Sequence, residues 1–173
     1  MKIAVIGHSG TGKSSLSKSI SVTYKIPLLY MDCVHFLPGW NKRSVNEERE
    51  IVGQFLKEND NWIIDGSYFK VLLDERLELA DKIILLELNR FSCLLRVYKR
   101  SIEYKNKPRE SITQGCHEVI DWDFIKHILF ERNKDAKIYQ EIKDKYKEKL
   151  IIVNNQRELD ELYKEFNVEN YIK

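Results

Sequence analysis

The sequence predicts an α/β fold, in which a parallel sheet of five strands is covered by helices on both faces. Short apolar runs alternate along the chain with segments whose apolar residues recur at helical spacing. Such runs are typical of strands buried on both faces of a parallel sheet. The five runs cover residues 2–6, 27–32, 62–65, 82–88 and 149–153.

Directly after the first run, residues 7–14 form a complete phosphate-binding loop of the form G-x-x-x-x-G-K-S. Its glycines allow a tight turn, so that several backbone N–H groups converge on one point at a helix N-terminus. Lys13 is expected to reach the β- and γ-phosphates, and the Ser14 hydroxyl to bind Mg²⁺. We therefore expect a P-loop NTPase that binds ATP and Mg²⁺ through Gly7, His8, Ser9, Gly10, Thr11, Gly12, Lys13, Ser14 and Ser15.

The spacing of apolar residues also places the helices. Leu16, Ile20 and Tyr24 recur every four residues behind the loop, and Ser44 with Glu47 forms a capping box that opens another helix. That second helix is expected to end near 59–61. Further helices are predicted over about 69–79, 91–102, 122–129, 138–146 and 158–166.

Length and composition favour one ordinary globular domain over residues 1–173, with a net charge of +2. This charge is too small to indicate a nucleic-acid surface. No apolar run is long enough to cross a membrane, and the chain enters a core strand at once, which leaves no room for a signal peptide. We expect a cytoplasmic protein, either a monomer or a homodimer.

The cysteines of the chain are far apart, which argues against a disulfide framework. Cys33 and His35 could be combined with Cys116 and His117 as a zinc site, but no C-x-x-C pair is present. Free thiols are the simpler interpretation.

Two aspartates follow predicted strands, at the sheet edge where parallel α/β proteins bind ligands. Asp65 ends the third strand and precedes Gly66, where a carboxylate can hold Mg²⁺ directly or through water. Helix capping is the alternative for Asp65. Asp32 ends the second strand and is expected to orient a phosphoryl acceptor or a metal-bound water, with a plain turn residue as the alternative.

Aromatic residues are dense between Asp32 and the capping box, and Pro38-Gly39 predicts a turn there. We expect this loop to cover the acceptor substrate, with contacts from His35 and Trp40, although packing under the loop would also explain them. Tyr68, just beyond the third strand, is a further candidate substrate contact.

Cations surround a polar segment that runs from about residue 105 to 121. Phosphoryl transfer spreads negative charge over three oxygens, and arginines on a mobile cover can stabilise it while water is excluded. We expect Arg100 and Arg132 to act in this way. The alternative is ordinary solvated charge on the surface. For Arg96 and Arg109 this alternative and a role in phosphoryl transfer are equally supported.

Together these features resemble the nucleoside monophosphate kinase group, and more closely the bacterial DNA topology modulation proteins, also called FlaR-like and related to adenylate kinase. The matching segments are 3–14, 30–40 with its His35 and Pro38-Gly39-Trp40, 62–68, and Gly115-Cys116 followed by Asp121. The resemblance implies the kinase fold with strand order 2-3-1-4-5, an acceptor-binding part near 33–60 and a lid near 100–135.

The chain departs from true adenylate kinases, which carry an arginine after strand two and a Phe-Pro-Arg after the strand-three Asp-Gly. Here these places read Met31-Asp32-Cys33 and Ser67-Tyr68-Phe69-Lys70. Arg43, Lys70 or Arg76 would have to bind the acceptor phosphate in place of the missing arginines, which argues against AMP as the acceptor. The sequence thus predicts a kinase that moves the γ-phosphoryl of ATP to a nucleotide, nucleoside or other metabolite. The alternative is a non-enzymatic, nucleotide-dependent regulator of DNA topology, although no helix-turn-helix or basic stripe supports direct DNA binding.

Overall fold

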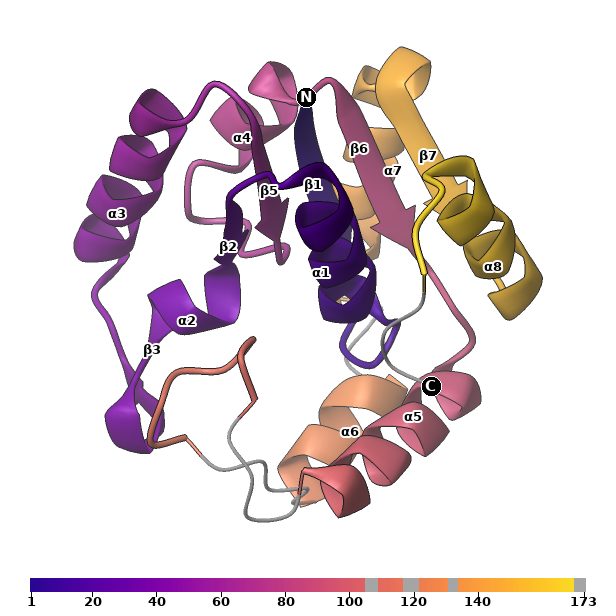
Figure 1. Cartoon of the computed structure of the whole chain (residues 1–173). Helices are drawn as coiled ribbons and strands as arrows, with labels where there is room; N and C mark the ends of the chain where they lie inside the picture. The colour runs from indigo at the N-terminus through magenta and orange to yellow at the C-terminus, as the bar shows by residue number, and fades with distance from the viewer. Residues whose placement is uncertain (105–108, 117–121, 131–133, 170–173) are drawn as a thin grey trace.

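The computed structural model describes residues 1–104, 109–116, 122–130 and 134–169, and its centre is a parallel five-stranded sheet (Figure 1). The strands lie in the order β2-β5-β1-β6-β7, and every neighbouring pair is parallel. Without β3 and β4, which form a separate hairpin, this is the predicted order. The bounds are β1 Lys2–Gly7, β2 Leu28–Tyr30, β5 Trp62–Asp65, β6 Lys82–Leu86 and β7 Leu150–Val153.

Helices cover both faces of the sheet, as the sequence predicted. One face carries α1 (Lys13–Tyr24) and α8 (Gln156–Glu165), whose apolar residues share one buried cluster. Helix α5 (Arg90–Glu103) adds Cys93 and Val97 to this cluster. The other face carries α3 (Val45–Glu58), α4 (Leu73–Leu79) and α7 (Ala136–Lys145), which share the second cluster. Beyond the carboxyl ends of the strands, α6 (Trp122–Phe130) lies beside α5 (Figure 1).

The central strand shows why its sequence is a continuous apolar run. Successive side chains of a strand point to opposite faces of a sheet. Ile3 and Val5 accordingly join the cluster under α1, whereas Ala4 and Ile6 join the cluster under α3 and α7. All four are at most 2% exposed, so each layer of helices packs on apolar side chains of β1.

The structure corrects the predicted second strand. It ends at Tyr30, and Met31–His35 forms the short helix α2, so Asp32 lies in the first turn of α2 and does not end a strand. Met31 and Val34 are one helical turn apart and both buried, which holds α2 against the core. The hairpin follows as β3 (Phe36–Leu37), the turn η1 (Pro38–Trp40) and β4 (Asn41–Lys42), with Gly39 at a φ of 75°.

Helix α3 begins as predicted. The Ser44 side chain accepts from the Glu47 N–H, and the Glu47 carboxylate accepts from the Ser44 N–H, which is the reciprocal capping box. Helix α4 begins later than predicted, at Leu73. Tyr68 and Leu72 have φ angles of 34° and 47°, and such left-handed residues cannot belong to a right-handed helix.

The described part of the polar segment lies against the predicted acceptor-binding part. The Thr113 hydroxyl donates to the Phe36 carbonyl, and the Gly39 N–H donates to the Gly115 carbonyl at 3.3 Å. The Cys116 thiol donates to the Leu37 carbonyl, also at 3.3 Å. These contacts join two segments that are 76 to 79 residues apart in sequence.

All cysteines are free thiols, and the described residues contain no cluster of His, Cys, Asp and Glu that could hold a zinc ion. His117 lies outside the described residues. In the part of the chain that the structure describes, no helix is long and apolar enough to span a bilayer.

Candidate active site

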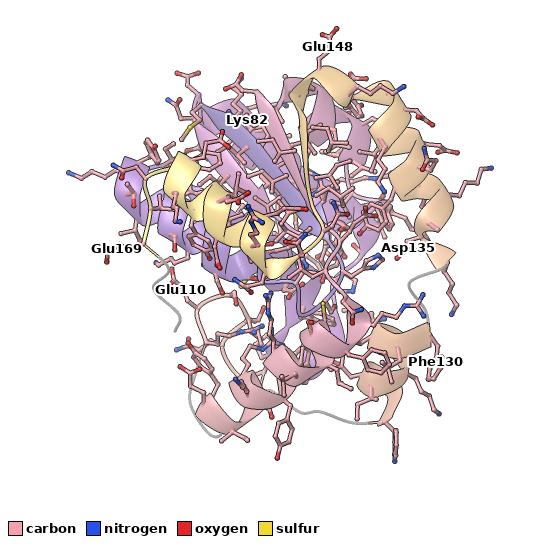
Figure 2. All side chains as sticks on the ribbon, turned by 90° about the vertical axis from the view of Figure 1, so that its right-hand side faces the viewer. Lys82, Glu110, Phe130, Asp135, Glu148 and Glu169 are labelled. Carbon is pink, nitrogen blue, oxygen red and sulfur yellow. The ribbon has the colours of Figure 1, made fainter. Side chains whose placement is uncertain are left out.

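A cleft of about 1440 Å³ lies beyond the carboxyl ends of the strands. The phosphate-binding loop forms its base, the hairpin and Tyr68 form one wall, and α5 forms another. Glu110 and Asp135 also line it, and Figure 2 labels them on opposite sides of the molecule. The cleft therefore brings together the predicted donor site, the predicted acceptor segment and the arginines of α5.

The glycines of the loop are required by its geometry. Gly7 has a φ of 137°, and a Cβ atom there would lie 2.3 Å from the Leu86 carbonyl oxygen. Gly10 has a φ of 79°, and a Cβ atom there would lie 2.7 Å from the Cys93 carbonyl oxygen. Gly12 is the N-cap of α1 and brings no capping side chain. The N-terminus of α1 therefore faces the cleft as an anion site.

Lys13 is held at the centre of this loop. Its ammonium donates to the His8 carbonyl at 2.9 Å, and the Thr11 hydroxyl donates to the same carbonyl at 2.8 Å. Burial lowers the pKa of Lys13, while the nearby charges of Asp65 and Asp32 oppose this effect. Thr11 is fully buried and does not line the cleft, unlike the other predicted nucleotide contacts, so its side chain stabilises the loop from inside.

Asp65 ends β5 beside Lys13 and Ser14, as the sequence predicted, and it is 5% exposed. Burial raises the pKa of its carboxyl group to about 6, although the Lys13 charge and a hydrogen bond with Ser14 act in the opposite direction. Its Oδ1 atom is buried and has no hydrogen-bond partner among the described residues. A hydroxyl and a carboxylate oxygen are the donors that Mg²⁺ prefers, so Ser14 and Asp65 fit the ion that the sequence predicted.

Asp32 lies in the same cleft and is held by Tyr68. The Tyr68 hydroxyl donates to Asp32 Oδ1 at 2.7 Å. Burial and the neighbouring Asp32 charge both raise the pKa of Tyr68, so its hydroxyl keeps its proton and remains a donor. The Asp32 charge also acts on Lys13 and on Asp65, which places the carboxylate near the phosphate end of the cleft.

Arg76 has a role that the sequence did not indicate. It is 1% exposed, and its guanidinium donates to the carbonyls of Gly66, Ser67 and Tyr68 at 2.9, 2.6 and 3.1 Å. Burial lowers its pKa to about 10. Arg76 therefore fixes the backbone that carries Tyr68, and it cannot replace the missing acceptor arginine. No sequence pattern distinguishes it from a solvated arginine on an amphipathic helix.

The two acceptor-loop candidates differ in position. His35 does not line the cleft: its Nδ1 atom lies 2.8 Å from an oxygen of the buried Glu48, which joins α2 to α3. Its ring packs against Phe36 and Tyr68, which do line the cleft, and a direct contact of His35 with substrate stays a prediction. Trp40 does line the cleft and is 41% exposed, with its ring edge-to-face on Phe36 at 4.9 Å. Its contact with an acceptor stays a prediction.

Among the predicted cations, Arg100 lines the cleft near Lys13. Arg96 lines the cleft as well and braces the phosphate loop, because it donates to the Thr11 carbonyl at 2.8 Å and to the Gln156 side chain. Arg109 also lines the cleft, and its charge acts on Asp65. Arg43 donates from Nε to the Val34 carbonyl at 2.9 Å. Arg132 lies outside the described residues, so its predicted role is unchanged.

No family model and no curated protein matches the chain, so the family named from the sequence is not confirmed. Solved structures do match. A deoxyadenosine kinase from M. mycoides, with the products dCMP and dCDP bound, is 14% identical over 96% of this chain and 99% of its own, with a TM-score of 0.52. The same enzyme with bound dATP is 15% identical over the same shares, with a TM-score of 0.51.

The protein TT1252 from Thermus thermophilus is 12% identical over 95% of each chain, with a TM-score of 0.57. At these identities the matches show the fold alone. The chain has the fold of P-loop kinases. That result agrees with the strand order, the phosphate loop and the position of the cleft.

Proposed function

We propose that this protein is a phosphotransferase that moves the γ-phosphoryl group of ATP to a hydroxyl group of a small acceptor. The observation that carries the proposal is the Asp32 carboxylate, which the Tyr68 hydroxyl holds at 2.7 Å in the same cleft as Lys13. A carboxylate there would repel an acceptor phosphate, whereas it can take the proton of a hydroxyl group. A hydroxyl acceptor therefore suits this cleft better than a nucleoside monophosphate.

On the donor side, the loop N–H groups at the start of α1 and the Lys13 ammonium would hold the phosphates of ATP. Ser14 and Asp65 would hold Mg²⁺, which neutralises charge that develops between the β- and γ-phosphates. Arg100 lines the cleft from α5 and would stabilise the transferring group. This chemistry needs positioning and charge stabilisation, and it needs no covalent intermediate.

In the proposed step the acceptor oxygen attacks the γ-phosphorus, and the bond to the bridging β–γ oxygen breaks. The acceptor proton passes to the Asp32 carboxylate, and ADP is the leaving group. Phe36, Trp40 and Tyr68 offer aromatic faces and edges along the acceptor wall, which suits a planar ring. A nucleoside combines such a ring with a free hydroxyl, and deoxyadenosine kinase is among the proteins that share the fold.

The test is Asp32→Asn, assayed with ATP and a panel of nucleosides. We expect the variant to bind ATP like the wild type and to lose about 10²–10⁴-fold in kcat, the usual loss for a general base. Asp60→Asn changes an exposed carboxylate far from the site and serves as the matched control. A full kcat in Asp32→Asn would contradict the hydroxyl-acceptor mechanism. ATP binding without turnover on any acceptor would favour the regulator hypothesis instead.

A further inference from the structure

Helix α5 presents an apolar stripe to solvent. Its four large residues are more than half exposed: Phe91 at 74%, Leu95 at 56%, Tyr98 at 58% and Ile102 at 60%. Their spacing of four, three and four residues places them within an arc of about 60°, since successive residues of a helix are rotated by about 100°. This is the spacing of a helix seam that packs against another helix.

The neighbouring helix α6 carries two more exposed aromatic residues. It lies beside α5, and the Arg90 guanidinium joins the two by donating to the Leu129 carbonyl at 2.7 Å. Trp122 and Phe130, at its two ends, are 74% and 69% exposed. Figure 2 shows Phe130 at the end of the molecule opposite Glu148, beyond the sheet. We call these six residues of α5 and α6 the apolar end face.

The size of the apolar end face matches a protein interface. An aromatic side chain presents about 200 Å² when fully exposed, so the exposed fractions of the four aromatic residues alone leave roughly 550 Å² of apolar surface, and the two aliphatic residues add to it. The largest patch of a typical monomer is about 300–600 Å². A stable interface of standard size takes about 800 Å² from each partner, and the polar rim around the stripe would supply the rest.

We propose that the apolar end face binds the same face of a second copy of this chain, so that two α5–α6 pairs form a four-helix interface. A seam of regularly spaced apolar residues on paired helices can pack against its own copy about a two-fold axis, because each knob then meets an equivalent hole. Arg96 and Arg100 lie on the opposite side of α5, toward the cleft. The dimer therefore leaves the cleft accessible.

The experiment compares wild type, Leu95→Glu and Tyr98→Glu by sedimentation equilibrium from 0.1 to 100 µM, a range chosen to bracket ordinary homodimer affinities of about 1 µM or tighter. We expect a wild-type dimer and at least about 30-fold weaker association in each variant, the loss typical of a central interface residue. Leu79→Glu is the control, because Leu79 is an equally large apolar residue on α4, 46% exposed and outside the face. The Leu79→Glu variant is expected to remain dimeric.

Circular dichroism and ATP binding show whether each variant is folded, and neither Leu95 nor Tyr98 lines the cleft. If one glutamate variant fails to fold, Phe91→Glu replaces it. A monomeric wild type at 100 µM, or a dimer that both variants leave intact, would overturn the proposal. Binding of the wild-type monomer to anionic phospholipid vesicles, lost in Leu95→Glu, would also overturn it by assigning the face to a membrane surface.

Discussion

We predict that the buried Asp65 carboxylate lowers the unfolding free energy of the metal-free protein, and Asp65→Asn tests this prediction. Its carboxyl pKa is raised from 3.8 to about 6, chiefly by burial. A raised carboxyl pKa means that the folded state binds the proton more tightly than the unfolded state does. Ionisation therefore opposes folding, and the penalty grows as the pH rises from about 4 to about 6.

The size of the penalty follows from the two pKa values. Each pKa unit corresponds to about 1.4 kcal/mol, so the ionised carboxylate costs about 3 kcal/mol of unfolding free energy above pH 6. The opposing effects of Lys13 and Ser14 are already contained in the pKa of about 6. The isosteric Asn side chain carries no charge, so we expect the variant to be more stable than wild type by about this amount at pH 8.

Urea denaturation of the nucleotide-free protein between pH 4 and pH 8 measures the difference. The advantage of Asp65→Asn should be full at pH 8 and nearly absent at pH 4. Asp60→Asn removes an exposed carboxylate and should change the unfolding free energy by less than about 0.5 kcal/mol. An Asp65→Asn variant that is less stable than wild type at pH 8 would refute the reasoning and indicate that Asp65 caps local backbone.

Three further outcomes are expected. Lys13→Ala should abolish tight ATP binding in calorimetry, whereas an unchanged affinity for ATP would contradict the assignment of residues 7–14 as the phosphate-binding loop. Arg100→Ala should lower kcat by more than it raises the KM for ATP, because a contact made mainly in the transition state acts on kcat. A wild-type kcat in that variant would indicate that Arg100 is an ordinary solvated charge with no role in phosphoryl transfer. The tryptophan fluorescence of wild type should change on acceptor addition and less so on ATP alone, and Trp40→Phe should remove the acceptor response; an identical response in Trp40→Phe would place the acceptor elsewhere.

The sheet and the phosphate loop were predictable because local sequence determines them. Strands buried on both faces leave continuous apolar runs, and the loop needs glycines at positions where a Cβ atom would collide with backbone, as at Gly7 and Gly10. The position of Asp65 followed in turn, since parallel strands end at one edge of the sheet.

The acceptor wall was less predictable, because contacts distant in sequence form it. The strands β3 and β4 have two residues each, too few to show an alternating pattern. The role of Arg76 depends on three carbonyls exposed by a left-handed turn at Tyr68, and the partner of His35 lies on α3. Periodicity and spacing report none of these contacts, because they depend on how the elements pack.

The most direct test of the central claim is to follow ³¹P NMR spectra of the protein with ATP, Mg²⁺ and a panel of nucleosides, including deoxyadenosine, and nucleoside monophosphates. The account predicts that a phosphomonoester signal grows at the same rate as ADP, and that Lys13→Ala abolishes both signals. Release of inorganic phosphate alone, or transfer only to nucleoside monophosphates, would contradict phosphoryl transfer to a hydroxyl group in the cleft of Lys13 and Asp32.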